Sequence, residues 1–452
     1  MILSALSGLI HAAPDPFSVE DGIAAPCPLP GAPFIPPAAP LTLPEVIDLA
    51  LCHNPKTRSA WANAKIEANL LGQAQAAYLP SLDGQLESSR KKTRYNHDPA
   101  STDRQKTASL SLSWLLLDFG GRSANMDYQR QLLSAALAEQ ETARQTVFLE
   151  TLNAFYQVHA HIAAVEAAKA SEAAAERSFR TASGRYQAGV ATPVEQLQAE
   201  TAFSQAVLSR IKSEGELANA RGALAYALGL DAHVLIPLIN PGVLPALAEA
   251  QDFTNQIEEL IARAIANRPD IAASEARYRA AEAATRAARS QGLPTLSFSA
   301  FANRQEGHAT DSRSGSLGLT LRVPLFSGFA DSYRIRAAEA RLEQSGVARE
   351  QLLRDVSLDV WRSAQELRVT TQSLATTLNL FASAEAAEAM ALGRYQSGVG
   401  TILDVLNAQS ALADARMQRI SAAYNWRMHR AALARALGTL GKPLLDELLD
   451  TP

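Results

Sequence analysis

The sequence predicts a mostly α-helical fold that also carries a small β-sheet, and three observations support this fold class. The chain of 452 residues is internally duplicated, with the same order of segments in each half. Both halves contain short segments in which apolar and polar residues alternate, as they do in strands. Each half also contains a stretch without proline, 122–184 and 330–392, that is long enough for an extended helix.

The composition excludes several classes of protein. Lys and Arg total 42 against 46 for Asp and Glu, so the net charge of -4 indicates no nucleic-acid partner. The mean hydropathy of -0.07 and the lack of a long apolar run exclude a helical membrane protein. Neither a phosphate-binding glycine loop, nor a nucleophile elbow, nor a His-Glu-x-x-His motif occurs. We therefore expect no enzyme and no cofactor.

No metal site is expected, because the eight histidines show no ligand spacing and two cysteines are too few for a zinc site. Cys27 and Cys52 are expected to be lone thiols. Residues 3–10 are apolar and resemble the end of a secretory signal, although no Lys or Arg precedes them. Either the start is truncated or the segment is not a signal. Residues 1–41 are interpreted as a signal remnant and a proline-rich tether.

Two pairs of motifs define the duplication. Gly-Arg-Tyr-Gln-x-Gly-Val occupies 184–190 and 393–399, and Ala-Leu-Ala-x-Ala-Leu-Gly occupies 223–229 and 432–438. The segments that these anchors define are repeat 1 at 42–230, an equatorial linker at 231–255, repeat 2 at 256–438 and a tail at 439–452.

Each repeat is predicted to begin with two helices that a proline separates, because proline cannot continue a helix. These helices are 42–53, 56–77, 256–266 and 270–291. A β-hairpin follows in each repeat, at about 80–118 and about 294–326, with alternating apolar residues on one face. The polar segments 91–106 and 303–314 are interpreted as the hairpin loops.

Long helix pairs complete the repeats, at 122–230 and 330–438. Val360, Leu367, Leu374 and Phe381 recur every seven residues, which predicts coiled-coil packing. Four strands are too few to close a membrane barrel, but three copies would pool about twelve. A pooled barrel with a helical tube predicts a conduit, and a soluble coiled-coil scaffold is the alternative.

Three motifs carry a resemblance to a known family. Trp-Leu-Leu-Leu-Asp-Phe-Gly-Gly-Arg at 114–122 and Val-Pro-Leu-Phe-Ser-Gly at 323–328 join strand to helix, and the Arg-Tyr-x-x-Gly-Val motif occurs twice. Together with the duplication, these motifs resemble the TolC family of outer-membrane exit ducts. The resemblance implies a homotrimer with a twelve-stranded barrel in outer-membrane lipid, a small mixed equatorial region and a helical tunnel through the periplasm of a Gram-negative bacterium.

The resemblance also implies partners and cargo. A periplasmic adaptor and an inner-membrane pump would complete the machine and supply its energy. The cargo would be that of type I protein secretion or multidrug efflux. The alternative is a lipid-anchored duct of a drug or metal pump, but Cys27 follows a proline where lipid attachment needs a small residue.

The two helix-pair tips are candidate binding sites. Two long antiparallel helices must reverse there within a few residues, which favours glycine in a left-handed conformation. The resemblance further implies that these turns dock the adaptor. The candidate docking residues are Tyr186, Gly189, Val190, Gly398, Val399 and Thr401.

Asp404 and Asn407 lie three residues apart and therefore share a helix face. A threefold ring of such carboxylates would attract cations, whereas a plain role for Asp404 is to stabilise the helix N-terminus. The resemblance places the tunnel constriction at this pair and implies a latch. Its candidate residues are the repeat mates Glu195 and Gln198, with Tyr395, Arg394 and Arg185. Family members carry an arginine where this chain has Gly400, so Arg394 or Arg185 replaces it or the gate is looser.

Trp114 ends a strand, where an aromatic girdle would meet lipid headgroups, although ordinary packing at the joint would also explain it. Asp118 is expected to cap the long helix that follows.

Overall fold

The computed structural model describes residues 39–93, 101–239, 257–307 and 311–440. The chain divides into two compact units. One consists of Ala62–Glu139 and Asp270–Gln351, and the other of the described parts of Ile23–Trp61, Gln140–Pro269 and Leu352–Pro452. Each unit combines segments from both sequence repeats, so the repeats are not separate folding bodies.

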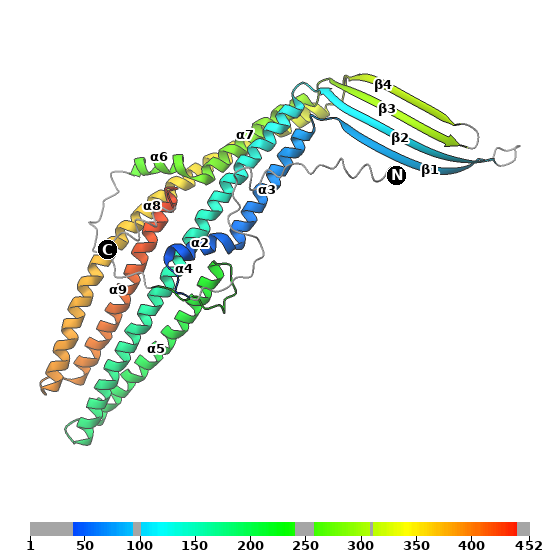
Figure 1. Cartoon of the computed structure of the whole chain (residues 1–452). Coiled ribbons are helices and arrows are strands. Elements are labelled where there is room, and N and C mark those ends of the chain that lie inside the picture. Colours follow the sequence, from blue (N-terminus) through cyan, green and yellow to red (C-terminus); the bar gives the residue numbers. More distant parts are fainter. Residues whose placement is uncertain (1–38, 94–100, 240–256, 308–310, 441–452) are drawn as a thin grey trace. The chain divides into compact units, whose positions relative to one another are not determined.

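The first unit contains one antiparallel sheet whose four strands lie side by side in chain order (Figure 1). The strands are β1 (Ser81–Thr93), β2 (Ser101–Leu117), β3 (Thr295–Gly307) and β4 (Ser312–Arg322). They extend into 91–106 and 303–314, so the expectation of hairpin loops there is wrong for most of these residues. The segments are polar on both faces and lack the alternation that reveals a strand, yet β2 keeps its ladder with β1 up to Thr93.

The two faces of the sheet differ in chemistry, because partners directly opposite each other point to the same side. One face carries two cross-strand rows, Leu82–Leu112–Ala300–Leu317 and Trp114–Phe298–Leu319. The row between them on the opposite face is Ser113–Ser299–Gly318. Leu317 and Leu319 are 78% and 67% exposed, so the apolar face lacks a cover within the described part of the chain.

Arg122 joins sheet to helix. Its guanidinium donates to the carbonyl oxygens of Leu115 at 2.6 Å and Leu116 at 3.1 Å, and lies 4.7 Å from the centre of the Tyr78 ring. Asp118 accepts a hydrogen bond from the Arg122 backbone N–H at 2.6 Å, which confirms the expected cap. The last β2 residues therefore hold the first turn of the next helix in place.

Two helical hairpins follow the strands, and their matching lengths reflect the duplication. Helices α4 (Gly121–Gln187) and α8 (Ala330–Gln396) each have 67 residues, and α5 (Pro193–Ala227) and α9 (Ile402–Ala436) each have 35. A straight helix of 67 residues would measure about 100 Å. Val360, Leu367 and Leu374 are buried, as the heptad pattern predicts.

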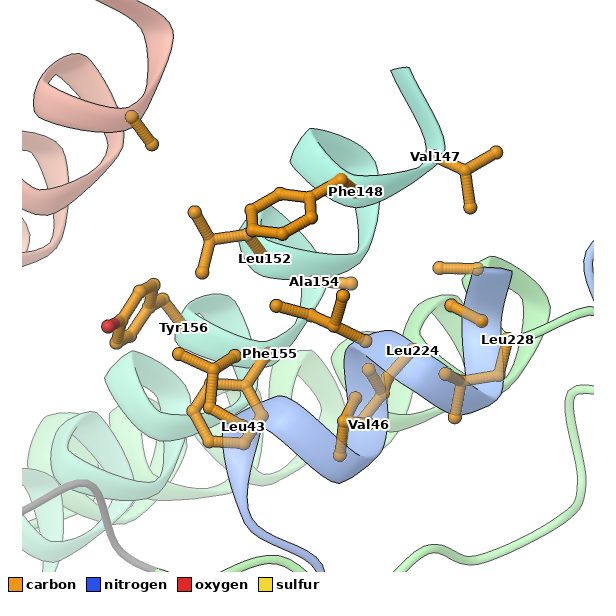
Figure 2. Close-up of a cluster of buried hydrophobic side chains, with 14 of the residues drawn as sticks. Leu43, Val46, Val147, Phe148, Leu152, Ala154, Phe155, Tyr156, Leu224 and Leu228 are labelled. Carbon is orange, nitrogen blue, oxygen red and sulfur yellow. The ribbon is translucent and has the colours of Figure 1, made fainter. Parts of the chain in front are cut away.

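The second unit has its main apolar core where helix α2 (Leu43–His53) packs against the middle of α4 and the end of α5. Figure 2 shows Val46 from α2 among Phe155 from α4 and Leu224 from α5. These three side chains are at most 2% exposed. Since most of the largest fully buried side chains of the described chain belong to this cluster, we expect it to be the main source of hydrophobic stabilisation in that unit.

The duplication extends to the ends of the returning helices. Asn54, between α2 and α3 (Pro55–Ala76), donates from Nδ2 to the carbonyl oxygen of Ala227 at 2.8 Å. Arg268, between α6 (Ile257–Asn267) and α7 (Pro269–Ser290), donates to the carbonyl oxygen of Ala436 at 3.3 Å. Each residue before the proline thus satisfies a terminal carbonyl of the helix beside it.

Two expectations about membrane helices and thiols can be compared with the structure. Among the described helices, none combines the length and apolar character that crossing a membrane requires. Cys52 is disulfide-bonded, so the expectation of a lone thiol there is wrong. Two isolated cysteines in a sequence do not reveal whether the fold brings them into reach. Cys27 lies outside the described residues.

Candidate functional site

The tips of the two hairpins are built by the same turn. Gly189 and Gly398 have φ angles of 75° and 79°, the left-handed conformation that glycine adopts without strain. The N–H of Val190 donates to the Arg185 carbonyl at 3.0 Å, and that of Gly189 to the Tyr186 carbonyl at 2.9 Å. Arg394, Tyr395, Gly398 and Val399 repeat this pattern. The duplicated motif is therefore a Schellman C-cap.

The helices that return from the tips begin with matching capping boxes. The hydroxyl of Thr401 accepts from the Asp404 N–H at 3.2 Å, and the Thr401 N–H donates to the Asp404 carboxylate at 3.1 Å. Thr192 and Glu195 make the same exchange at 3.4 Å. Both acidic residues thus have a structural role that their sequence position alone explains.

Tyr395 is the centre of the contact between the two tips. It is 2% exposed and packs with Ala182 and Ala199 of the first hairpin and with Ile402 and Val405 of its own. Burial raises the pKa of Tyr395, the charge of Arg185 opposes that rise, and the charge of Glu195 adds to it.

Of the two arginines proposed to replace the family's latch arginine, Arg185 contacts Tyr395. Its guanidinium lies 4.9 Å from the centre of the Tyr395 ring, and its Nη1 donates to the Tyr395 carbonyl at 3.4 Å. Arg394 is exposed and acts on Asp404 through its charge. A Cβ at Gly400 would lie 3.1 Å from the Cβ of Arg394, which leaves little room there for a larger residue.

The repeat mate of Tyr395 has a different environment. Tyr186 is 41% exposed, although both tyrosines occupy the same position of the Schellman motif. Val190 and Val399, which follow the two turn glycines, are 65% and 70% exposed, and Thr401 is exposed as well. The candidate docking residues therefore lie at the surface of the tips.

The candidate constriction residues are accessible too. Asp404, Asn407 and Gln198 are exposed and Glu195 is half-buried. Hydrogen bonds from the backbone and side chain of Thr401, aided by the charge of Arg394, lower the pKa of Asp404. Its carboxylate is therefore ionised at neutral pH.

Sequence reasoning missed two features near these sites. Exposed apolar side chains flank the capping boxes, with Leu197 60% and Leu403 51% exposed. At the strand-to-helix joints, Phe119 and Phe329 have φ angles of 51° and 65° and are 52% and 66% exposed. Their equivalent positions after the strands were a signal that could have identified them.

Trp114 donates its indole N–H to the Tyr78 carbonyl at 2.9 Å, so its polar group is already satisfied within the protein.

Comparison with known proteins connects this geometry to a family. A model of the outer membrane efflux protein family matches residues 46–230 and 260–439. Protein CyaE of Bordetella pertussis is 32% identical over 413 residues, which cover 90% of this chain and 86% of that protein. The cobalt-zinc-cadmium resistance protein CzcC of Cupriavidus metallidurans is 26% identical over 389 residues, with coverages of 84% and 86%.

A solved structure has the same fold. The outer membrane protein VceC of Vibrio cholerae matches with a TM-score of 0.75 at 23% identity, over 88% of this chain and 96% of that one. The family model matches all but the first four residues of each repeat and includes both tips. The chain therefore belongs to the outer membrane efflux protein family and is an exit duct of the outer membrane, as its duplicated tip motifs predict.

Proposed function

We propose that three copies of the chain assemble into a channel that carries substrates from an inner-membrane pump and a periplasmic adaptor to the cell exterior. The observation that carries this proposal is the two-faced sheet. Its apolar face is exposed, and β1 and β4 each have one edge that pairs with no other described strand. Such edges are unstable in lipid, where every backbone polar group needs a partner.

Pairing of β4 from one copy with β1 from the next removes both edges. Three copies then give a closed barrel of about twelve strands, within the known range for outer-membrane barrels. The leucine rows would face lipid and the serine rows the lumen. Phe119, Phe329 and Trp114 would lie at the headgroup level, where aromatic side chains are favoured.

The helical hairpins would form the tunnel wall, and their tips would meet the adaptor. The exposed Val190 and Val399 provide apolar contacts for such docking. In the trimer, three copies of Asp404 and Asn407 would form a constriction that attracts cations. The buried contact of Arg185 with Tyr395 would help to hold the tips closed. An unchanged conductance of Glu195→Ala would argue against a latch role for Glu195.

The cargo is proposed to be that of type I protein secretion or multidrug efflux. The name of the relative CzcC supports metal efflux as a second candidate. Deletion of the encoding gene distinguishes these cases. Loss of a secreted protein from the medium indicates protein cargo, and increased sensitivity to drugs or to divalent metals indicates the corresponding pump.

The assembly itself is tested by negative-stain electron microscopy of the detergent-solubilised protein. We expect threefold particles that require detergent for solubility. A monomer that remains soluble without detergent would contradict both the pooled barrel and the channel, and would favour a coiled-coil scaffold instead.

A further inference from the structure

The contact between the two tips has two complementary parts. We call Ala182, Arg185 and Ala199 of the first hairpin the socket, and Tyr395, Ile402 and Val405 of the second hairpin the knob. All members are buried except Arg185, which is half-buried. Arg185 covers the ring of Tyr395, so the knob is both packed and held by a cation–π contact.

The duplication provides a second socket and a second knob in the same chain. At an offset of 209 residues (394 − 185), the socket residues correspond to Ala391, Arg394 and Ala408, and all three residue types are identical. The counterparts of the knob are Tyr186, Pro193 and Gln196, of which the tyrosine is retained. The chain thus carries the socket residues twice but repeats only the tyrosine of the knob, and its internal contact uses one arginine and one tyrosine.

The arginine of the second socket and the tyrosine of the second knob are exposed in the single chain, whereas Ala391 packs against the filled contact. Tyr186 is 41% exposed, and Arg394 is exposed with no side-chain hydrogen bond or ion pair among the described residues. An exposed arginine on one hairpin and an exposed tyrosine on the other can form a head-to-tail interface, which closes into a ring when identical copies are related by rotation.

We infer that Arg394 of one copy covers Tyr186 of the next copy, so that the contact between subunits repeats the contact that Arg185 makes with Tyr395 within the chain. This inference rests on the trimer proposed above. A second copy fits this surface because it presents the residues that the internal contact already pairs. If no such contact between copies forms, Tyr186 is left exposed for the adaptor.

The test uses the full-length protein in detergent, without adaptor, with the photoreactive residue p-benzoylphenylalanine in place of Tyr186. Irradiation is expected to give dimers and trimers on a denaturing gel, and the cross-linked peptides should include residues near 391–408 of another copy. The matched control carries the same residue in place of Tyr395. It should cross-link within its own chain and remain monomeric on the gel.

Particle size and negative-stain images of the same samples separate the two proposals. Suppose the images show trimers, but irradiation of the variant at position 186 gives only monomers on the denaturing gel, or links position 186 to position 186 of another copy. Either result would overturn the inference and leave the proposed channel intact. Monomers of the unmodified protein would overturn both. If the substitution at 186 prevents assembly, the reciprocal placement at 394 must link to the peptide containing Tyr186, and failure to do so in trimers overturns the inference.

Discussion

Substitution of Gly229 by alanine should destabilise the helical unit more than the same substitution at Gly189. Both glycines have a φ angle of 75°. An added Cβ at Gly189 meets nothing within 4 Å, whereas at Gly229 it would lie 2.6 Å from the His53 carbonyl oxygen and 2.9 Å from its carbon. Comparison of the two alanine variants therefore separates the cost of backbone strain, which both share, from the cost of the steric clash at Gly229.

The left-handed conformation costs an alanine about 1–2 kcal/mol at either site. At Gly229 the end of α2 must also move away from α5, and overpacking of this kind costs about 1–3 kcal/mol more. That movement would stretch the hydrogen bond from Asn54 to Ala227, now 2.8 Å long. We expect a total of about 2–5 kcal/mol for Gly229→Ala and about 1–2 kcal/mol for Gly189→Ala.

Thermal unfolding of the detergent-solubilised variants, followed by the far-ultraviolet signal of the helices at one scan rate, measures this difference. A shared rate matters because large proteins often unfold irreversibly. Gly229→Ala should have the lower apparent midpoint of the two. Equal midpoints would show that the joint between α2 and α3 moves freely, and would refute the tight contact at the end of α5.

Further predictions concern charge, the joint and pH. In planar bilayers, Asp404→Asn should lower the cation selectivity at neutral pH, because the hydrogen bonds of Thr401 lower the pKa of this carboxyl and keep it ionised there. Arg122→Ala should destabilise the strand-to-helix joint by about 2–4 kcal/mol, since it leaves the Asp118 carboxylate and the carbonyls of Ala77, Leu115 and Leu116 without this guanidinium, and Arg122→Lys should restore part of the loss in thermal unfolding. Burial, with the nearby charge of Arg427, lowers the pKa of His159 to about 4, so the unfolded chain binds a proton first. Stability should therefore fall as the pH decreases from about 6.5 to 4, and His159→Gln should remove that part of the pH dependence in denaturant titrations.

Much of the fold could be predicted because local patterns determine it. The prolines at 55 and 269 separate the short helices, and the alternation from 110 to 116 marks β2. The lengths of the hairpins follow from the positions of the turn motifs. The far ends of the strands could not be predicted, because both faces are polar there: the pair Arg90–Arg104 lies on one face and the pair Ser89–Gln105 on the other, so no alternation marks the strands.

At the tips, the sequence predicted the turns but not the partners of their side chains. Gly189 and Gly398 form equal turns because a Schellman cap depends on a few neighbouring residues. Which arginine covers Tyr395 depends on how two distant hairpins pack. The motifs are identical at Arg185 and Arg394, so no local signal distinguishes them.

This difference explains which positions of a duplicated chain stay alike. The turn glycines and the N-cap threonines Thr192 and Thr401 serve the same local hydrogen bonds in both repeats, so they are retained. Ile402 and Pro193 occupy equivalent positions but differ in environment, one in the knob core and the other exposed. A face that packs within the chain and a face left for another copy therefore have different requirements. Since Arg394 repeats Arg185, the contact proposed between copies would pair it with the other tyrosine of this turn, Tyr186.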